Sequence, residues 1–341
     1  MSLPALDLVL ADARVVALPL RVRFRRIDVR EVLLLRGPAG WGEFAPFPEY
    51  DDAESAWWLA AALESAWWGQ PQALRSTVAV NATVPAVEAE RVPEVLLAFP
   101  GCTTAKVKVA ERGQGLDDDL ARVAAVRELV PRVRVDANGG WTPTEAVRAL
   151  TALRGQGPME YAEQPCAEVP GLAEVRTRLA AAGVDVLIAA DESIRRAEDP
   201  LRVARAGAAD VAVLKVPPLG GMRRVLALAR TLQQEHDLPV VVSSALDSAV
   251  GIGAGLAAAA ALPVLEHACG LATGGLLARD VAAPATPVNG ELAVGAVVPD
   301  EARMAGVAAA AERQLWWRQR ISRAHALLAS GHPAWPPPGG V

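Results

Sequence analysis

Six charged residues recur through the middle of the chain at a nearly constant interval. They are Lys106, Lys108, Asp136, Glu163, Asp191 and Lys215. Each carboxylate, and Lys215, closes a short apolar run, whereas the other two lysines lie inside one. From Lys108 onward the separations are 28, 27, 28 and 24 residues, close to the roughly 25–30 residues that one strand and its helix use in a β/α barrel. Because the strands of such a barrel are parallel, their C-terminal ends meet on one face, and the spacing predicts one pocket that holds all six side chains.

The three carboxylates predict a divalent-metal site. Mg²⁺ prefers hard oxygen ligands in octahedral geometry and keeps some positions for water or substrate, and three carboxylates from successive strand ends would supply half of such a shell. A single Asp or Glu at a strand end usually caps a helix or forms a salt bridge, but three at one fixed interval favour a metal. The histidines show no spacing that suits a softer metal; they are His236, His267, His325 and His332.

The lysines indicate the type of reaction. Side chains alternate along a strand, so Lys106 and Lys108 point to the same face. Each disfavours the protonation of the other, and a nearby metal lowers both pKa values further, so that one lysine could act as a base. Lys215, on the predicted sixth strand, would face this pair from across the barrel mouth. Lone lysine pairs are usually solvated, and only the combination with the carboxylates favours catalysis.

Proton abstraction beside a carboxylate is the chemistry that needs this arrangement. The α-proton is weakly acidic, and the resulting enediolate carries two negative charges on its oxygens. A divalent ion near those oxygens can supply several kcal/mol of stabilisation. The pattern therefore predicts a metal-dependent enzyme that acts on a small carboxylate.

Length and composition fit this prediction. A chain of 341 residues suits a barrel of about 200–250 residues with a smaller partner domain. The net charge of −5 and the lack of a Lys/Arg block argue against nucleic acid or an anionic membrane surface as a partner. The first residues lack the pattern of a signal peptide, the most apolar window is interrupted by Asp247 and Pro263, and the three cysteines form no CxxC pair. We therefore expect a cytoplasmic protein with reduced thiols and no membrane insertion.

Both ends of the chain differ in pattern from its middle. Residues 5–18 and 27–37 are extended apolar runs, 40–47 follow the turn GPAG as a hairpin, and a helix from Asp51 or Asp52 runs through Trp68. After residue 286 the rhythm breaks into a hairpin-like piece, a helix containing Trp316 and Trp317, and a Pro/Gly-rich tail that we expect to be loose. These segments predict one α+β capping domain built from residues 1–76 and 286–341.

From residue 77 to 285 the pattern alternates between strand and helix. Apolar runs occur in STVAVNATV, TTAKVKV, RVRVDA, MEYAE, VLIAAD, DVAVLKV, PVVVSSA and PVLEHA. The stretches between them read as helices, such as 117–130 and 144–154, each introduced by an Asp or Thr cap. Eight strands alternating with helices predict an α/β fold, a modified (β/α)8 barrel that the capping domain covers at its mouth.

The motifs KVK, DAN, EQP, DES and KVPPLGG resemble those of the enolase superfamily, in its muconate-lactonizing subgroup. The resemblance extends over nearly the whole chain. It implies Asp136, Glu163 and Asp191 as ligands of Mg²⁺, for which Mn²⁺ could substitute. It further implies Lys108 as the base on one face, Lys215 as the lysine on the opposite face and Lys106 as the partner that tunes Lys108. Asn138, Gln164 and Glu192 would support the metal ligands from behind.

Three further segments narrow the resemblance within the subgroup. GWGEFAPFPEYD, VVVSSALDSAVG and HACGLATGGLLARDV are similar to members that dehydrate a hydroxycyclohexadiene carboxylate to an aromatic product in menaquinone synthesis. Dipeptide epimerases instead carry Asp-x-Asp after the eighth strand, where this chain reads HACGLAT from His267 to Thr273. Enzymes that racemize N-succinylamino acids share the catalytic set and remain an alternative, as does a catalytically silent barrel used for binding.

Substrate contacts are predicted at both ends of the pocket. Loops 43–52 and 21–26 would close over the substrate, and the arginines of the second loop could meet a carboxylate. Hydroxyl and backbone N–H donors come from the ends of strands seven and eight; the candidates are Ser243, Ser244, Gly270, Leu271 and Thr273. The Gly-rich turn at 270–275 is no phosphate cradle, because no GK[ST] follows it. The oligomeric state stays open, and a monomer is compatible with the sequence.

Overall fold

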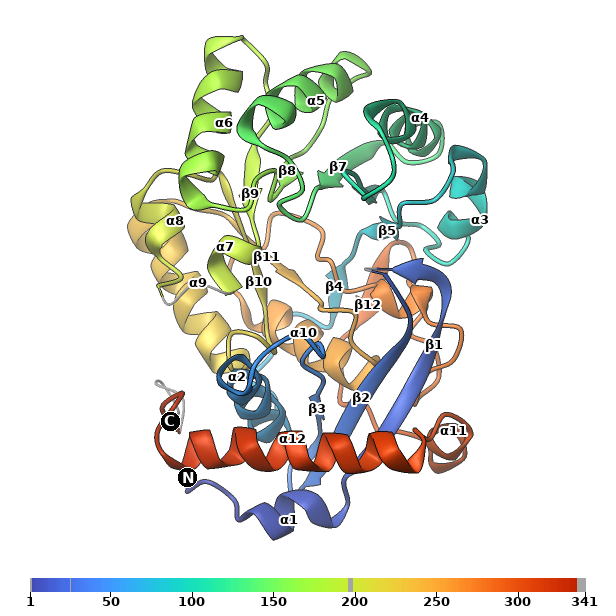
Figure 1. Ribbon diagram of the computed structural model, residues 1–341, viewed down its shortest axis with the longest axis vertical. Helices are drawn as coiled ribbons and strands as arrows, with labels where there is room; N and C mark the ends of the chain where they lie inside the picture. Colours follow the sequence, from blue (N-terminus) through green and yellow to red (C-terminus); the bar gives the residue numbers. More distant parts are fainter. Residues whose placement is uncertain (1, 25, 196–198, 336–341) are drawn as a thin grey trace.

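A curled parallel sheet forms the centre of the computed structural model, which describes residues 2–24, 26–195 and 199–335 (Figure 1). Seven strands are hydrogen-bonded in the order β11-β10-β9-β8-β7-β6-β5. They are β5 (Ala82–Val84), β6 (Thr104–Lys108), β7 (Arg132–Asp136), β8 (Ala162–Glu163), β9 (Ile188–Ala190), β10 (Val211–Lys215) and β11 (Val240–Ser243). Each strand pairs in parallel with the next strand of the sequence. All C-terminal ends therefore point to the same side, as the predicted barrel requires.

The ring is closed by a short eighth segment. Cys269 forms a parallel bridge to Val80, and Gly270 forms one to Ser243 at the end of β11. The eighth strand was predicted in PVLEHA, residues 263–268, and the pairing falls instead on the two residues that follow. The reason is local: Pro263 donates no backbone hydrogen bond, and the buried residue of this region is Cys269.

Buried Arg134 ties the inside of the barrel together. Its guanidinium donates to Asn81 Oδ1 at 3.1 Å and to the carbonyl of Ala268 at 2.7 Å, which lie on either side of the closure. It also pairs with Glu160 at 2.7 Å and lies 4.6 Å from the ring centre of Tyr161. These bonds satisfy most donors of a side chain that has no exposed surface, as burial of a cation demands.

Helices cover the outside of the sheet between successive strands. They are α3 (Val92–Leu96), α4 (Leu116–Arg127), α5 (Pro143–Gly155), α6 (Val169–Ala181), α7 (Glu192–Arg195), α8 (Arg202–Arg205), α9 (Met222–His236) and α10 (Ala249–Ala261). The predicted Asp or Thr cap of the helix over 144–154 is Thr142, whose hydroxyl accepts from the backbone N–H of Glu145, so that α5 begins one residue earlier than expected. The prediction of an Asp or Thr cap was wrong for α4, which begins after Gly115; the Asp118 side chain accepts from the Gly115 N–H there.

The capping region joins residues from both ends of the chain. An antiparallel sheet, β1-β2-β3, is covered by α2 and by α12, and Figure 1 shows α12 lying across this part with α1 beside it. The elements are α1 (Leu6–Ala11), β1 (Arg14–Phe24), β2 (Ile27–Gly37), β3 (Gly40–Phe44), α2 (Asp52–Leu63), a π-helical turn (Glu64–Trp68), β12 (Glu291–Ala293), α11 (Glu301–Gly306) and α12 (Ala311–Ala329). Most buried apolar residues of this sheet and of α1, α2, α11 and α12 share one cluster that includes Leu18, Phe44, Trp58 and Trp317, whereas Leu292 of β12 belongs to the barrel core.

Helix α12 is fixed to the N-terminal half by aromatic and polar contacts. The Trp317 ring meets Phe44 edge-on with centroids 5.8 Å apart, and its indole N–H donates to Glu31. Buried Arg320 donates to the carbonyls of Phe47 and Tyr50 at 2.8 and 2.6 Å. The turn before α2 is therefore held by Arg320 of a helix, and this residue lies 270 residues after Tyr50 in sequence.

Several local expectations at the chain ends need correction. Residues 6–11 form helix α1 and not a strand, because the pattern LDLVLA fits both periods and the helix buries Val9 against the capping cluster. The hairpin after GPAG is present, with Gly37 paired to Gly40. The C-terminal hairpin-like piece contributes β12, which pairs with β4 (Thr77–Ala79). Trp335 of the tail packs on Trp68 with ring centroids 5.4 Å apart, while 336–341 lie outside the described residues. Among the described residues, no helix is long and apolar enough to cross a membrane.

Glu43 joins the capping region to the barrel. Its side chain lies buried beside the start of α10. The carboxylate accepts hydrogen bonds there from the backbone N–H groups of Ser248 and Gly251, at 3.1 and 3.0 Å. Such acceptors satisfy the free N–H groups of a helix N-terminus. Asp247 lies close by, equally buried. The prediction that Glu43 belongs to a loop closing over the substrate was therefore wrong: this residue is part of β3 and holds the segment after β11.

Stability should depend on pH through Glu43. Burial, followed by the charge of Asp247, raises the pKa of Glu43 from its ordinary value of 4.5 to about 8. The folded chain therefore binds a proton that the unfolded chain releases between these values, so the free energy of unfolding falls as pH rises through this window. We expect wild type to lose up to about 1.4 kcal/mol per pH unit relative to Glu43→Gln. Urea unfolding from pH 5 to pH 8 checks this, and a constant difference between the two proteins would contradict it.

Candidate active site

Strand register places the first members of the predicted site side by side. Lys108 at the end of β6 is paired with Asp136 at the end of β7, and Asp136 is paired with Glu163 at the end of β8. Asp191 follows β9 directly, and Lys215 closes β10. All six charged residues therefore come together at the C-terminal end of the sheet, as their spacing predicts.

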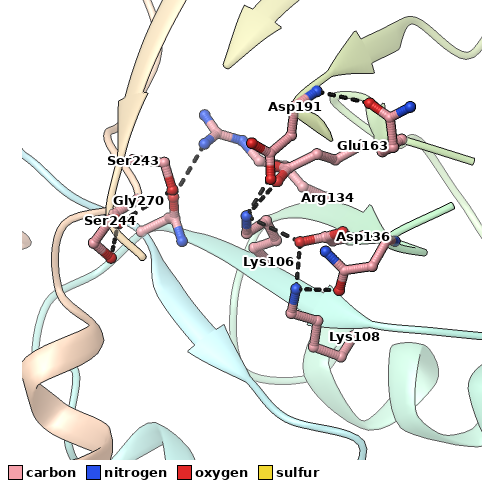
Figure 2. Close-up of polar contacts among 12 residues, drawn as sticks. Lys106, Lys108, Arg134, Asp136, Glu163, Asp191, Ser243, Ser244 and Gly270 are labelled. Atoms are coloured by element: carbon pink, nitrogen blue, oxygen red, sulfur yellow. Dashed lines mark hydrogen bonds and ion pairs between the residues drawn. The ribbon is translucent and has the colours of Figure 1, made fainter. Parts of the chain in front are cut away.

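Each carboxylate contacts at least one lysine, and Figure 2 shows the contacts of Lys106 and Lys108. Lys106 Nζ lies 2.8 Å from Glu163 Oε1 and 3.2 Å from Asp136 Oδ2. Lys108 Nζ lies 2.5 Å from the same oxygen of Asp136. On the other side of the group, Lys215 Nζ lies 2.6 Å from Asp191 Oδ2. All of these side chains are at least seven-eighths buried, so the charges compensate one another in a poorly solvated place.

The pKa directions follow this crowding. Burial opposes the charge of Asp136, but Lys108 and Lys106 outweigh it and lower the pKa. Burial likewise opposes the charge of Asp191, and Lys215 and Arg195 lower its pKa to about 2. Glu163 behaves differently, because burial and then the charge of Asp136 raise its pKa to about 7. Burial is therefore the main reason that Glu163 is harder to ionise, and the neighbouring Asp136 adds to it, while Lys106 acts in the opposite direction.

Lys106 departs from the sequence-based expectation. Burial favours its neutral form, but the charges of Glu163 and Asp136 outweigh burial and raise its pKa. The predicted lowering of the Lys106 pKa by Lys108 is therefore outweighed by these two carboxylates, which lie closer to Lys106 than the strand pattern alone indicates.

The donor chemistry fits a hard divalent cation. Three carboxylates come from the ends of three adjacent strands, and such oxygen ligands suit Mg²⁺. A cation beside Glu163 would favour its ionised form against the effect of burial. Within the described ranges, however, no three Asp, Glu, His or Cys side chains are spaced to hold a metal ion as they stand. Lysine ammonium groups also contact oxygens of all three carboxylates. A cation bound to these carboxylates would therefore have to replace the lysines there.

Polar residues behind the carboxylates fix them in place. Asn138 accepts from Lys108 Nζ at 2.7 Å and donates to Glu192 at 3.2 Å. Gln164 accepts from the backbone N–H of Asp191 at 2.9 Å. Asn138 and Gln164 have positive φ, 46° and 41°, an uncommon conformation for residues with a side chain. The structure thus brings all three predicted supporting residues to the site.

A small cavity lies in front of the lysines. Its volume is about 30 Å³ as the side chains stand, room for about one water molecule. The lining includes four of the five predicted pocket residues, Ser243, Ser244, Gly270 and Thr273. The Ser244 hydroxyl lies 2.7 Å from Thr273 Oγ1 and donates to the Gly270 carbonyl. Leu271 is buried but lines a neighbouring cavity of about 530 Å³ together with Arg21 and Arg279.

The capping region supplies one wall of this cavity. Phe24, from the predicted loop 21–26, is buried there, and its ring centre lies 5.3 Å from Lys108 Nζ. Outside this cavity, Arg23, Arg26 and Glu49 line a wider hollow of about 1210 Å³. Phe24, Lys108 and Asn138 line both the hollow and the inner cavity. Arg25 lies outside the described residues. The arrangement forms an entrance in which basic side chains precede the lysines.

Three residues of the site escaped the sequence analysis. Thr83 on β5 lines the cavity beside Lys106, its partner in register. Leu246 also lines this cavity. Its φ is positive at 62°, a strained conformation for such a residue, and Arg30 donates a hydrogen bond to its carbonyl. Arg195 contacts Asp191. Only Arg195 had a usable signal, since it follows Asp191 by four residues and so lies on the same side of a helical turn.

Known proteins resemble this chain along nearly its whole length. The chain matches the family described as Enolase C-terminal domain-like over residues 89–302 and the one described as Enolase N-terminal domain-like over residues 15–66. It is 62% identical to the o-succinylbenzoate synthase of Mycolicibacterium smegmatis, over 96% of this chain and 99% of that protein. It is 60% identical to the o-succinylbenzoate synthase of Mycobacterium tuberculosis, over 96% and 97%.

Solved structures with the same fold agree. The 2-chloromuconate cycloisomerase of Rhodococcus opacus aligns with a TM-score of 0.71 at 24% identity, over 87% of this chain and 98% of that one. The muconate lactonizing enzyme of Pseudomonas fluorescens aligns with a TM-score of 0.72 at 23% identity, over the same shares. Both support a modified TIM barrel with a capping domain. With the sequence families matched over more than half of its length, the chain belongs to the enolase superfamily.

Proposed function

We propose that this chain is a hydro-lyase that forms o-succinylbenzoate, the product named in its mycobacterial relatives. The substrate is 2-succinyl-6-hydroxy-2,4-cyclohexadiene-1-carboxylate, SHCHC, and the reaction is a step of menaquinone synthesis. One observation carries the assignment: 62% identity to an o-succinylbenzoate synthase extends over 96% of the chain. The geometry supports the type of reaction, because Lys108 and Lys215 contact the cluster of three protein carboxylates from two sides, at Asp136 and at Asp191.

Lys108 is the base of this proposal. Its amine takes the proton from the carbon that bears the substrate carboxylate, the C–O bond on the neighbouring carbon breaks, and the same group returns the proton to the departing hydroxyl. Water leaves and the ring becomes aromatic. The lysine must be neutral for this, so it has to leave Asp136, and the nearby charge of Lys106 then favours the neutral amine. Phe24 beside it keeps this side of the cavity poorly solvated.

Lys215 has a different role from that of Lys108. It lies across the group on β10, in contact with Asp191. From there its ammonium stabilises the negative charge that develops on the substrate by electrostatic attraction. Ser243, its register partner on β11, and Ser244 border the same cavity with hydroxyl groups. Substrate contacts of these serines, of Gly270 and of Thr273 are part of the proposal.

The superfamily depends on a divalent metal, and Mg²⁺ is the ion we propose, with Mn²⁺ as a substitute. Asp136, Glu163 and Asp191 would hold it. When bound, it supplies positive charge to the carboxylate oxygens of the substrate. Asn138, Gln164 and Glu192 then keep the ligand side chains in place, an effect typical of residues behind a metal site.

The pocket favours an anionic substrate without an amine. Arg23, Arg26 and Arg112 line the outer hollow together with Glu49 and Glu111, and the surplus of positive charge would attract a dicarboxylate. The segment from His267 to Thr273 has no carboxylate that could bind a substrate ammonium group. N-succinylamino acid racemization is the alternative that the same lysines would support, since it also begins with removal of an α-proton.

Removal of the metal or of one ligand charge should abolish activity. We expect no o-succinylbenzoate formation after exhaustive chelation and recovery with Mg²⁺. Glu163→Gln should lower kcat by orders of magnitude with little change in circular dichroism, because it removes one charge from the predicted shell. Full activity of the chelated protein in an ultraviolet assay would contradict the proposal.

Lys108→Arg should abolish exchange of the substrate α-proton with deuterated solvent. Arginine keeps the positive charge but cannot become the neutral base. Lys215→Ala should instead slow the overall reaction through lost charge stabilisation. Exchange is measured by proton NMR on a slowly reacting carboxylate analogue, and wild-type exchange by Lys108→Arg would mean that another group is the base.

Substrate choice can be tested with three assays on one preparation. Aromatisation makes dehydration of SHCHC strongly downhill, so a mostly apolar pocket with few donors suffices. We expect efficient o-succinylbenzoate formation, at most slow N-succinylamino acid racemization and no measurable dipeptide epimerization. An enzyme that epimerizes dipeptides well and leaves SHCHC unchanged would overturn the assignment while leaving the superfamily membership intact.

A further inference from the structure

Arg195 occupies a junction behind the site. Its side chain is buried and donates to Asp191 Oδ1 at 3.0 Å, to Glu192 Oε1 at 2.7 Å and to the Tyr50 hydroxyl at 3.0 Å. Asp191 and Glu192 belong to the barrel, whereas Tyr50 lies in the turn before α2 of the capping region. One guanidinium therefore bonds groups of both parts of the molecule.

Two bonded paths lead from Arg195 to the two sides of the site. The first is short: Asp191 holds Arg195 through Oδ1 and Lys215 through Oδ2, which is 2.6 Å away. The second runs through Glu192, which accepts from Asn138 Nδ2 at 3.2 Å, and Asn138 in turn accepts from Lys108 Nζ at 2.7 Å. The rigid fork of a guanidinium can hold several acceptors in fixed directions, which a lysine cannot do.

Tyr50 is itself fixed by the capping region. Its ring is buried against Phe47 and Trp58, with centroids 5.6 and 6.1 Å away. Its carbonyl accepts from Arg320 of α12 at 2.6 Å. A hydroxyl on such a rigid support can restrain the guanidinium that it contacts.

We infer that Arg195 is a positioning residue through which Tyr50 sets the affinity of the site for its divalent ion. Arg195 holds one oxygen of Asp191, so this carboxylate presents its second oxygen toward Lys215 in a fixed orientation. Loss of the guanidinium frees Asp191 to rotate and removes the cation that Glu192 contacts at 2.7 Å, and both changes weaken a shell built on Asp191. The inference rests on the proposed metal role of Asp191.

The test measures Mn²⁺ affinity of the full chain without substrate, by electron paramagnetic resonance of the free ion. Arg195→Gln should raise Kd roughly 10- to 100-fold, as expected for residues behind a metal ligand, and Arg195→Lys should recover part of the loss. Tyr50→Phe, which removes one hydroxyl, should raise Kd roughly fivefold. Arg323→Gln is the matched control, because Arg323 pairs with Asp52 on the surface of the same capping region and should leave Kd unchanged.

Thermal unfolding and circular dichroism of each variant separate positioning from a purely structural tie. A lowered melting temperature with wild-type Kd in both Arg195→Gln and Tyr50→Phe would overturn the inference, and Tyr50→Phe keeps the test decisive if Arg195→Gln fails to fold. Asp191→Asn tells the two claims apart. If wild type binds Mn²⁺ no better than Asp191→Asn, the metal assignment fails, and the inference fails with it. If Asp191→Asn binds Mn²⁺ more weakly than wild type but Arg195→Gln and Tyr50→Phe keep the wild-type Kd, the inference alone fails.

Discussion

The burial of three carboxylates at neighbouring strand ends is the constraint on which this structure depends. Asp136, Glu163 and Asp191 are almost fully buried, and like charges so close cannot all stay ionised without cations beside them. Three lysines supply those cations as the side chains stand, and each of them is also a candidate for the chemistry. The lysine–carboxylate pairs therefore reduce the cost of burying these charges, and the carboxylate oxygens are of the type that a divalent ion prefers.

Barrel and cap both serve this constraint. Parallel register brings Lys108, Asp136 and Glu163 into one row, and Arg134 with the Cys269–Gly270 closure keeps the ring shut beneath it. The cap excludes water with Phe24, and it reaches the barrel through Glu43 at α10 and through Tyr50 at Arg195. The position of the cap therefore affects both walls of the cavity.

The sequence predicts the charged group well because its signal is regular. Strand spacing fixes which end of each strand a residue occupies, so all six charged residues fall where the pattern puts them. Asn138, Gln164 and Glu192, which the family resemblance implies, lie beside them. Contacts across the domain joint have no such period. Tertiary packing determines where Glu43 lies, the positive φ of Leu246 and the contact of Tyr50 with Arg195. The eighth strand lies a few residues after its predicted position and pairs through only two bridges. The domain boundaries at 76 and 286, and the roles of the site residues, stay predictions.

The central claim is that a divalent ion replaces the lysines at the carboxylates. Anomalous X-ray diffraction from crystals grown with Mn²⁺ tests it most directly. The account predicts one strong anomalous peak at bonding distance from Asp136, Glu163 and Asp191, with the amino groups of Lys106, Lys108 and Lys215 moved off these oxygens. A peak elsewhere, or a site in which all lysine–carboxylate pairs persist at full Mn²⁺ occupancy, would contradict it.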